Sequence, residues 1–390
     1  MSKHDSVTIP TGRFASTTCR FVNRFARDSG TAQKVAGARS LTPVLPLDVA
    51  DLTAEWFGAA LERDVTGMEL LDMSSGTTGR AHVALTGDPS VPPTVFVKLA
   101  PFDQRQREFV TSVGMGVAEA RFYRDLAPEI PVRIPGVWFA DTEGEGYVMV
   151  LEDLVAGGCR FPHPADGDIG WRARDIVEQM AALHSRFWES PRFDDEGDLA
   201  WLAPKGTGAA GGGARYVRMA VDAIGDRLPP AFHRLADIYL ARNDDIVRLW
   251  NSGPRTLVHG DPHLGNLFVD TVAGDRTGFL DWAMLGRSPG LRDVAYVLCN
   301  SIPAEVRAAE ERALVERYCA LLAVAGVDLD AEVAWEQYRL FAVYSWVSAT
   351  STAGMGSKWQ PLHIGLGGTR RATAACEELG CVDLLERLLA

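Results

Sequence analysis

The chain contains few cysteines, no long apolar run and no excess of basic residues. Its six cysteines are scattered over 390 residues without a CxxC pair, which argues against a disulfide framework and favours reduced thiols. No stretch of about 18 apolar residues occurs, so neither a membrane span nor a membrane partner is expected. The first residues do not have the pattern of a signal peptide, and we expect a cytoplasmic protein.

The charge of the chain is unevenly distributed. A formal net charge of −12 argues against broad nucleic-acid binding, which needs a basic surface that displaces counterions. This charge would attract cationic substrates from a distance, although an acidic surface that serves solubility is the simpler interpretation. Residues 1–46 differ because they carry seven Lys or Arg and only two acids. We interpret them as a basic, partly disordered extension; a transit peptide and a mobile basic arm are the alternatives.

Hydrophobic patterns divide the rest of the chain into two predicted lobes, as its length leads us to expect. Residues 47–152 are predicted to form an α+β lobe. Its helices are expected over residues 47–64 and 104–126, the second one broken near Gly114 and Gly116, and its strands within residues 67–100 and 146–151.

Residues 153–390 are predicted to be mainly helical, with a small sheet that carries polar loops. The expected helices cover residues 171–188, 230–250, 304–325 and 331–350, and short strands are expected at residues 266–269 and 278–280. A Gly-rich run at residues 206–214 lacks the Lys-Ser/Thr ending of a phosphate-binding loop. A flexible surface loop is therefore the better interpretation of this run.

The strongest chemical signal is LVHGDPHLGNLFVD at residues 257–270. It places Asp261 five residues before Asn266, and Asp281 follows at the end of the next strand-like run. Two carboxylates and an amide on neighbouring strand ends offer the oxygen ligands that Mg²⁺ prefers. A carboxylate in this position can also orient a hydroxyl and accept its proton, so the pattern predicts phosphoryl transfer.

Two alternatives compete for these residues. Asp and Asn often only cap turns, but the joint spacing of Asp261, Asn266 and Asp281 favours a functional site. His259, Asp261 and His263 also form an H-x-D-x-H pattern, which could belong to a metal-dependent hydrolase. That alternative is weaker because no further cluster appears among the eight histidines, and His263 is interpreted as a loop residue near the site.

Lys98 lies in the middle of the apolar strand VFVKLA. A buried ammonium group needs an anionic partner, and Glu119 on the next predicted helix is the candidate, with Glu108 as its competitor. A lysine that extends its ammonium to solvent is the alternative. Upstream, a turn between two strands could bind phosphates through backbone N–H groups of Ser75, Gly76, Thr77 and Gly79.

Together these segments resemble the aminoglycoside phosphotransferase and choline kinase superfamily. HGDPHLGN is similar to its HGD-x4-N catalytic loop, and LDWAMLGRSPGLRDVAYVL to its metal-binding Asp segment with the following Gly-rich turn and Asp-x-Ala helix. MVLEDL resembles the hinge of the ecdysteroid-kinase-like and aminoglycoside-kinase-like branches. The resemblance covers about residues 67–300. It implies a bilobal, protein-kinase-like α+β fold, with an antiparallel sheet plus helix in the N-lobe and a mainly helical C-lobe.

The resemblance also implies roles for the catalytic residues. Asp261 would be the catalytic base, and Asn266 and Asp281 would bind Mg²⁺. Lys98 would contact the α- and β-phosphates of ATP and pair with Glu119.

Further positions are implied around this centre. The Gly76–Gly79 turn would cover the triphosphate, and the segment from Glu152 to Leu154 would offer backbone groups to adenine. His259 would brace the catalytic loop, and Asp293 would tie that loop to the following helix.

Two departures from protein kinases favour a small-molecule kinase. Gly260 replaces the Arg that precedes the catalytic Asp in protein kinases, and no long activation loop separates Asp281 from Asp293. That Arg usually reads a phosphate on the activation loop, so its absence indicates an enzyme without this switch.

The acceptor remains open at this stage. His263, Trp335, Tyr338 and Trp346 are possible lining residues of its pocket, although core packing is the default interpretation of the aromatic residues. Aromatic walls would favour an apolar alcohol, whereas Glu332 and Glu336 could bind a cationic amine.

The sequence thus predicts an ATP-dependent kinase that phosphorylates a hydroxyl of an aminoglycoside-like antibiotic, a sugar, an amino alcohol or an apolar alcohol. Its partners would be ATP and this acceptor, with Mg²⁺ as cofactor. A non-catalytic nucleotide-binding protein is the alternative, against which the intact Lys98, Asp261 and Asp281 argue. The oligomeric state is not predicted.

Overall fold

The computed structural model describes residues 43–202, 212–356 and 362–390. Contacts divide the chain into a unit of residues Met1–Leu41 and a unit of residues Thr42–Ala390. The predicted extension at residues 1–46 therefore falls almost entirely outside the described residues, as do residues 206–211 of the predicted Gly-rich loop. The last part of that run, from Gly212, begins a helix instead of a loop. None of the described helices combines the length and apolar composition needed to cross a bilayer.

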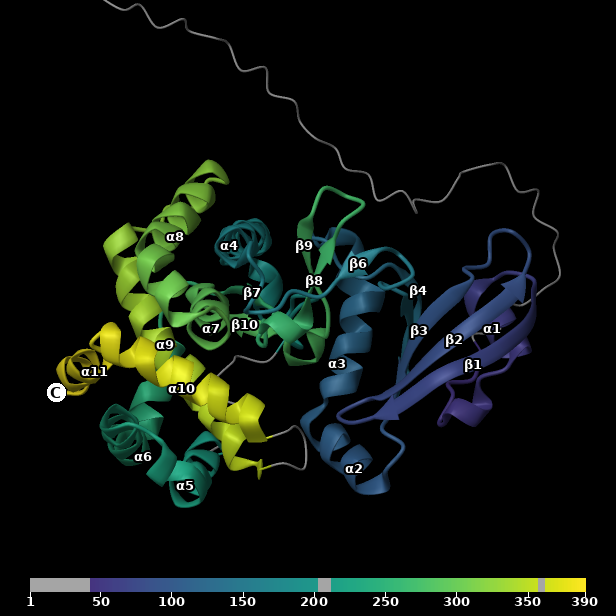
Figure 1. The fold of residues 1–390 in the computed structure, drawn as a ribbon. Coiled ribbons are helices and arrows are strands. Elements are labelled where there is room, and N and C mark those ends of the chain that lie inside the picture. The colour runs from purple at the N-terminus through teal and green to yellow at the C-terminus, as the bar shows by residue number, and fades with distance from the viewer. Residues whose placement is uncertain (1–42, 203–211, 357–361) are drawn as a thin grey trace, which may run out of the picture. The chain divides into compact units, whose positions relative to one another are not determined.

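A five-stranded antiparallel sheet with the order β1-β2-β3-β5-β4 forms the first part of the larger unit (Figure 1). Its strands are β1 (Val65–Ser75), β2 (Gly79–Gly87), β3 (Thr94–Leu99), β4 (Val137–Glu143) and β5 (Gly146–Glu152). Three helices accompany it: α1 (Ala54–Leu61), α2 (Gln104–Val113) and α3 (Met115–Arg121). The expected break of the second helix occurs at Gly114, whose φ of +65° favours glycine.

The alternation along the strands decides which side chains meet which helix. Val148 and Val150 of β5 join the apolar cluster that includes α1, whereas Tyr147, Met149 and Leu151 join the cluster that includes α3. Lys98 on β3 is paired with Met149, between the buried Val97 and Leu99. Because successive side chains of a strand point to opposite faces of the sheet, the ammonium of Lys98 points toward the α3 side.

The second part of the unit is mainly helical, which confirms the predicted α+β fold class. Its helices are α4 (Ile169–Arg186), α5 (Gly212–Ile224), α6 (Pro230–Trp250), α7 (Leu291–Ser301), α8 (Ala304–Val324), α9 (Ala331–Gly354), α10 (Leu362–Glu378) and α11 (Cys381–Leu389). The four helices expected from periodicity correspond to α4, α6, α8 and α9.

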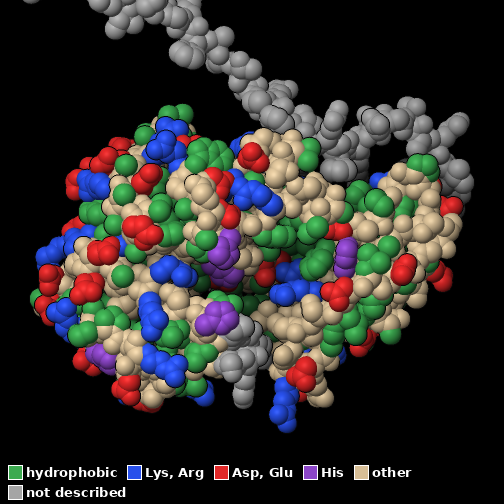
Figure 2. Space-filling view, in the orientation of Figure 1, with side chains coloured by type: hydrophobic (Ala, Val, Ile, Leu, Met, Phe, Trp, Pro, Cys, Tyr) green, Lys and Arg blue, Asp and Glu red, His purple; other side chains and the backbone are tan. Residues whose placement is uncertain are grey.

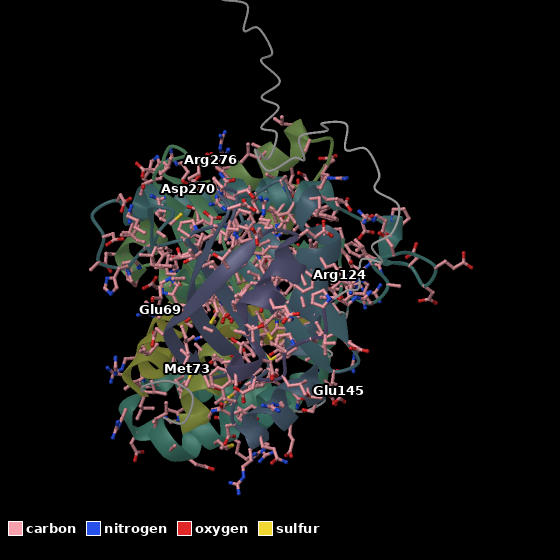
Figure 3. All side chains as sticks on the ribbon, turned by 90° about the vertical axis from the view of Figure 1, so that its right-hand side faces the viewer. Glu69, Met73, Arg124, Glu145, Asp270 and Arg276 are labelled. Carbon is pink, nitrogen blue, oxygen red and sulfur yellow. The ribbon has the colours of Figure 1, made fainter. Side chains whose placement is uncertain are left out.

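Two small sheets carry the polar loops of the helical part. One has the order β6-β8-β9, with β6 (Cys159–Arg160), β8 (Leu267–Asp270) and β9 (Arg276–Phe279); the other pairs β7 (Thr256–Val258) with β10 (Gly286–Ser288). Leu267 is paired with Phe279, and the Leu280 N–H donates to the Asn266 carbonyl at 3.0 Å. This register brings Asn266 next to the strand end that precedes Asp281. Asp270 and Arg276, labelled in Figure 3, lie at the opposite end of the same hairpin.

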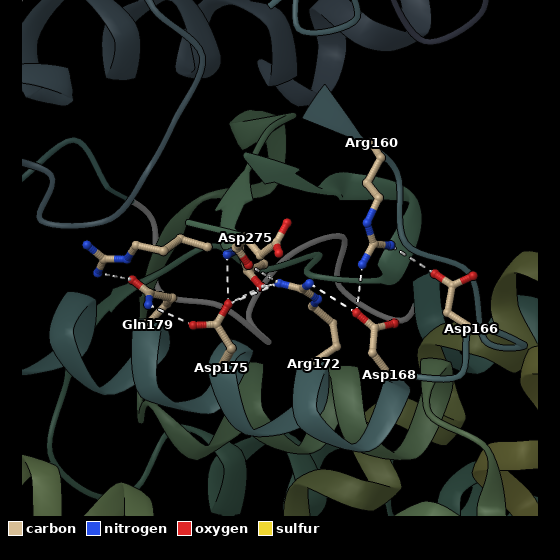
Figure 4. A network of polar contacts seen from close by, with 9 residues as sticks. Arg160, Asp166, Asp168, Arg172, Asp175, Gln179 and Asp275 are labelled. Carbon is tan, nitrogen blue, oxygen red and sulfur yellow. Dashed lines mark hydrogen bonds and ion pairs between the residues drawn. The ribbon is translucent and has the colours of Figure 1, made fainter. Parts of the chain in front are cut away.

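A buried polar network ties the start of β9 to α4 (Figure 4). The Arg172 guanidinium donates to the Asp275 carbonyl at 2.6 Å and to Thr277 Oγ1 at 3.1 Å. Asp175 accepts from the Thr277 N–H at 2.7 Å and from its hydroxyl at 2.5 Å. Because β9 leads directly to Asp281, this network fixes the strand that carries a predicted metal ligand.

Arg172→Ala should lower the free energy of unfolding by about 3–5 kcal/mol, because it leaves the Asp175 carboxylate buried without its cation. Urea denaturation measures this loss. Arg160→Ala is the matched control: it removes a cation from the same network, but that side chain is 40% exposed against 1% for Arg172. We expect a loss of at most about 1 kcal/mol for the control, and equal losses in the two variants would contradict the prediction.

Candidate active site

Lys98 lies between two carboxylates from distant parts of the chain. Its Nζ is 2.5 Å from Glu119 Oε2 on α3 and 3.1 Å from Asp281 Oδ1 after β9. The side chains of Lys98 and Glu119 are 6% and 0% exposed, so this cluster is largely out of water. Glu108, the competing partner, instead accepts from Gln104 on the exposed side of α2.

One ammonium facing two carboxylates drives the pKa values of the carboxylates apart. Burial raises the pKa of Glu119 to about 7, and the charge of Lys98 opposes this only in part. Burial also acts to raise the pKa of Asp281, but the charge and hydrogen bond of Lys98 outweigh it and leave that pKa below its usual range. Burial acts to lower the pKa of Lys98, yet the two carboxylates leave it raised. Lys98 and Asp281 therefore stay charged at neutral pH, and Glu119 is the group that takes up a proton first.

The predicted catalytic loop follows β7 and is held by a carboxylate on α7. Asp293 accepts the His259 N–H at 2.7 Å and the Gly260 N–H at 3.0 Å, and its side chain is fully buried. Gly260 has a φ of +86°, a conformation in which the Arg of protein kinases would be strained. Burial acts to raise the pKa of Asp293, but contacts with His184 and the loop leave it lowered, so it remains an acceptor for both N–H groups.

His259 bridges the predicted catalytic loop and the end of β9. Its Nε2 lies 3.0 Å from the Leu280 carbonyl, and its Nδ1 accepts the Asp261 N–H at 3.3 Å. A carbonyl only accepts, so Nε2 carries the proton, and burial lowers the pKa of His259, which keeps the ring neutral. Neither ring nitrogen is left for a metal ion, and no group of three His, Cys, Asp or Glu ligands occurs among the described residues. The engagement of both ring nitrogens argues against the hydrolase alternative.

Asp261 is partly exposed, and each of its oxygens has a neighbour. Tyr296 on α7 donates its hydroxyl to Oδ1 at 2.5 Å and itself accepts from the Ser348 hydroxyl on α9 at 3.2 Å. Oδ2 lies 3.3 Å from Asn266 Nδ2 and 3.7 Å from His263 Nε2. Sequence reasoning missed Tyr296 and Ser348. Tyr296 follows Asp293 by three residues, a helical spacing that could have indicated a second contact with the same loop.

Asn266 and Asp281 fit a site for Mg²⁺. The Asn266 amide nitrogen donates to the Asp261 carbonyl at 2.9 Å, so its amide oxygen is the atom left to face a cation. Asp281 has a φ of +62°, a left-handed conformation that is costly for a residue with a side chain and often occurs at functional sites. One carboxylate and one amide oxygen at adjoining strand ends match the preference of Mg²⁺ for oxygen ligands.

The predicted phosphate-binding turn joins β1 and β2. The Gly76 N–H donates to the Thr78 carbonyl at 3.1 Å, and Ser75 Oγ accepts the Phe102 N–H at 3.0 Å, which ties the turn to the segment after Lys98. A side chain on Gly79 would lie 2.5 Å from the Ala100 carbonyl, so only glycine fits there. Thr77 lies at the tip of the same turn, partly exposed.

The predicted hinge is held by Arg133, which sequence reasoning missed. Glu152 at the end of β5 binds Arg133 Nη2 at 2.7 Å, and Arg133 Nε donates to Asp270 at the end of β8 at 2.7 Å. The Glu152 side chain is therefore engaged. The backbone N–H of Glu152 donates to the Gly136 carbonyl, and the Leu154 carbonyl accepts from the Cys159 N–H. Contacts with adenine would therefore fall to other backbone groups, among them the Leu154 N–H.

The aromatic residues considered for the acceptor pocket lie mostly in the core. Tyr338 and Trp346 are fully buried and bind Glu311 at 2.7 Å and Thr373 at 3.1 Å. Trp335 stacks on Tyr338. This agrees with the interpretation as core packing. Of the four residues considered, His263 is the one with a polar contact to the Asp261 carboxylate.

A long internal stretch of the sequence identifies the family of the chain. Residues 74–351 match the phosphotransferase enzyme family, and the chain belongs to this family. It is accordingly a small-molecule kinase, a phosphotransferase with a hydroxyl group as acceptor. No curated protein matches the chain.

Several solved structures are similar to the chain at low identity. A choline kinase from Cryptosporidium parvum has a TM-score of 0.49 and 12% identity over 85% of this chain and 95% of its own. A Plasmodium vivax ethanolamine kinase has a TM-score of 0.44 and 15% identity over 79% and 81%. An aminoglycoside-3'-phosphotransferase of type VIII has a TM-score of 0.39 and 20% identity over 71% and 93%. These likenesses are too remote to support any conclusion about substrates.

The raised pKa of Glu119 predicts a dependence of stability on pH. Between its ordinary pKa of 4.5 and the folded value of about 7, the folded protein binds more protons than the unfolded chain. The free energy of unfolding should therefore fall as pH rises through this range, by on the order of 2–3 kcal/mol relative to Glu119→Gln. Urea denaturation of the nucleotide-free protein at several pH values measures this difference. Glu108→Gln is the control; a wild-type slope in Glu119→Gln would contradict the prediction.

Proposed function

We propose that the protein transfers the γ-phosphate of ATP to a hydroxyl group of a small molecule, with Mg²⁺ as cofactor. The observation that carries the proposal is the 3.1 Å contact between Lys98 and Asp281, which are 183 residues apart in the chain. It brings together a cation suited to phosphates and a carboxylate suited to the metal ion. The acceptors considered from sequence are an aminoglycoside-like antibiotic, a sugar, an amino alcohol and an apolar alcohol.

The nucleotide would bind between the sheet and the catalytic loop. Lys98 would contact the α- and β-phosphates, and Glu119 would hold the lysine in place. Backbone N–H groups of the turn between β1 and β2 would cover the triphosphate, but not that of Gly76, which donates to the Thr78 carbonyl. Mg²⁺, held by Asn266 and Asp281, would neutralise negative charge on the phosphates when bound.

Asp261 would orient the acceptor hydroxyl and take its proton. Oδ1 already accepts a hydrogen bond from Tyr296, so Oδ2 is the oxygen better placed for the acceptor. The hydroxyl oxygen would form a bond to the γ-phosphorus while the bond from this phosphorus to the leaving oxygen of ADP breaks. The hydroxyl proton would move to the Asp261 carboxylate, which balances the transfer.

Substitutions at the centre should separate catalysis from nucleotide binding. Asp261→Ala and Asp281→Asn should each lower kcat by at least about 100-fold, because they remove the base and a metal ligand. Lys98→Met should mainly raise the KM for ATP, since it removes a phosphate contact. ADP release over a broad panel of alcohols measures all three.

Unchanged turnover in Asp281→Asn would remove the metal assignment. Thermal stabilisation by Mg²⁺ and ATP without turnover would favour a non-catalytic protein.

Tyr296→Phe should lower kcat about 10- to 100-fold with little change in the KM for ATP, because the Asp261 carboxylate loses its short hydrogen bond without a change in the nucleotide site. Tyr344→Phe is the matched control, since this half-buried tyrosine stands 6.0 Å from the Tyr296 ring and does not bond to Asp261. Equal kcat values in the two variants would show that the contact has no part in catalysis.

A further inference from the structure

A second cation projects from the same face of the sheet as Lys98. Arg80 of β2 is paired directly with Lys98 of β3 in the antiparallel register. Directly opposed residues of such a pair place their side chains on one face, with Cβ atoms about 4.5–5.5 Å apart. Ala81 and Val97, the chain neighbours of the two cations, are fully buried in the cluster that includes α1. The Arg80 guanidinium therefore lies on the side of the sheet that faces α3 and Asp281.

His82 marks the opposite end of this face. It lies two residues after Arg80 on β2, so it shares the face, and its Nε2 is 2.7 Å from Asp153 Oδ2. Asp153 belongs to the predicted hinge, where adenine is expected, whereas Lys98 is expected to contact phosphates. Residues two apart on a strand are separated by about 6–7 Å. The strand β2 thus runs along the expected nucleotide, with His82 at the adenine end and Arg80 at the phosphate end.

The guanidinium of Arg80 is uncommitted. It forms no ion pair or hydrogen bond with any residue that the structure describes, although Arg80 is half-buried. Arg124 and Arg133, in the same part of the unit, each pair with two carboxylates instead. A guanidinium presents parallel N–H groups that match the oxygens of a phosphate. Arg80 is therefore available for an anion that enters from solution.

The charge of Arg80 acts on the cluster around Lys98. Burial acts to raise the pKa of Asp281, but the charge of Lys98, its hydrogen bond and then the charge of Arg80 lower it. The single ammonium of Lys98 is shared by Asp281 and Glu119, so this cluster has no net positive charge to offer a triphosphate. Figure 2 shows a hollow in the middle of one face, with Lys, Arg and His side chains at its edge. A second cation beside Lys98 would supply the missing attraction for an anion.

We propose that Arg80 is a second phosphate-binding residue, whose guanidinium binds the triphosphate of ATP beside Lys98. Arg80 directly follows Gly79, the last residue of the turn expected to cover the triphosphate. Lys98 is shared between the phosphates and two carboxylates, whereas Arg80 serves the phosphates alone. This inference rests on the proposed phosphotransferase function and adds a residue to its nucleotide site.

Calorimetric titration of ATP and of adenosine, each with Mg²⁺, separates a phosphate contact from a general effect on the sheet. Arg80→Gln should weaken the binding of ATP at least about tenfold, the effect of one lost charge-assisted hydrogen bond, and should leave the binding of adenosine unchanged. Arg80→Lys should retain part of the affinity for ATP, since it keeps the charge without the parallel N–H groups. Urea denaturation with the same cooperative transition as the wild type shows that the fold of Arg80→Gln is intact.

Arg63→Gln is the matched control, because it removes an equal charge from the other side of the same sheet. Arg63 is a half-buried residue just before β1, and its guanidinium lies 5.8 Å over the ring of Trp138, which packs against the cluster that includes α1. This variant should bind ATP like the wild type.

Equal binding of ATP to the wild type and to Arg80→Gln overturns the inference, as does an equal loss of ATP affinity in Arg63→Gln and Arg80→Gln. Equal losses for ATP and adenosine in Arg80→Gln also overturn it. ADP release at an unchanged KM for ATP in Arg80→Gln overturns the inference and leaves the proposed function standing. ATP binding that depends on Arg80, without ADP release over the panel of alcohols, supports the inference, and in that case the proposed function fails.

Discussion

The ammonium group of Lys98, buried between Glu119 and Asp281, is the interaction on which the rest of the site depends. An isolated charge in this position would be costly, and two carboxylates for one cation leave the cluster with a net negative charge. The protein accommodates that charge by raising the pKa of Glu119 and lowering that of Asp281. The cluster also joins the sheet, through β3 and α3, to the end of β9. Its geometry thus requires the strand alternation, the helix after β3 and the hairpin β8–β9 all to be in place.

Charged side chains outside this cluster hold the loops around it. Asp293 on α7 fixes the predicted catalytic loop through two backbone N–H groups. Arg133 joins the end of β5 to the end of β8, and Arg172 on α4 fixes the start of β9. Each of these side chains acts on backbone or on a hairpin end and need not touch a substrate. The polar groups expected to act on ATP and the acceptor are therefore positioned by charged side chains that each have partners of opposite charge.

Local patterns made much of the fold predictable from sequence. The helix Pro230–Trp250 has the predicted bounds, and the strand Thr94–Leu99 lies within the stretch predicted to form strands, because each has a clear hydrophobic period. Asp261, Asn266 and Asp281 could be grouped because the strand ends that carry them are close in sequence. In contrast, α5 and α10 were missed because glycines weaken their helical pattern, although in α10 glycines serve to bring it close to α9.

Contacts between distant segments could not be read from periodicity. Arg133 and Asp270 are 137 residues apart, and nothing in their local sequence links them. The aromatic residues of α9 also could not be placed from the sequence. Residues of a pocket wall and of a core have the same helical spacing. Only the packing of the neighbouring helices shows that Tyr338 and Trp346 lie in the core.

Calorimetric titration of ATP, with and without Mg²⁺, into the wild type and into Asp281→Asn tests the central claim most directly. If Asp281 holds the metal beside the phosphates that Lys98 binds, Mg²⁺ should tighten ATP binding to the wild type by about tenfold or more, and this gain should vanish in the variant. An equal gain from Mg²⁺ in both proteins would contradict the claim.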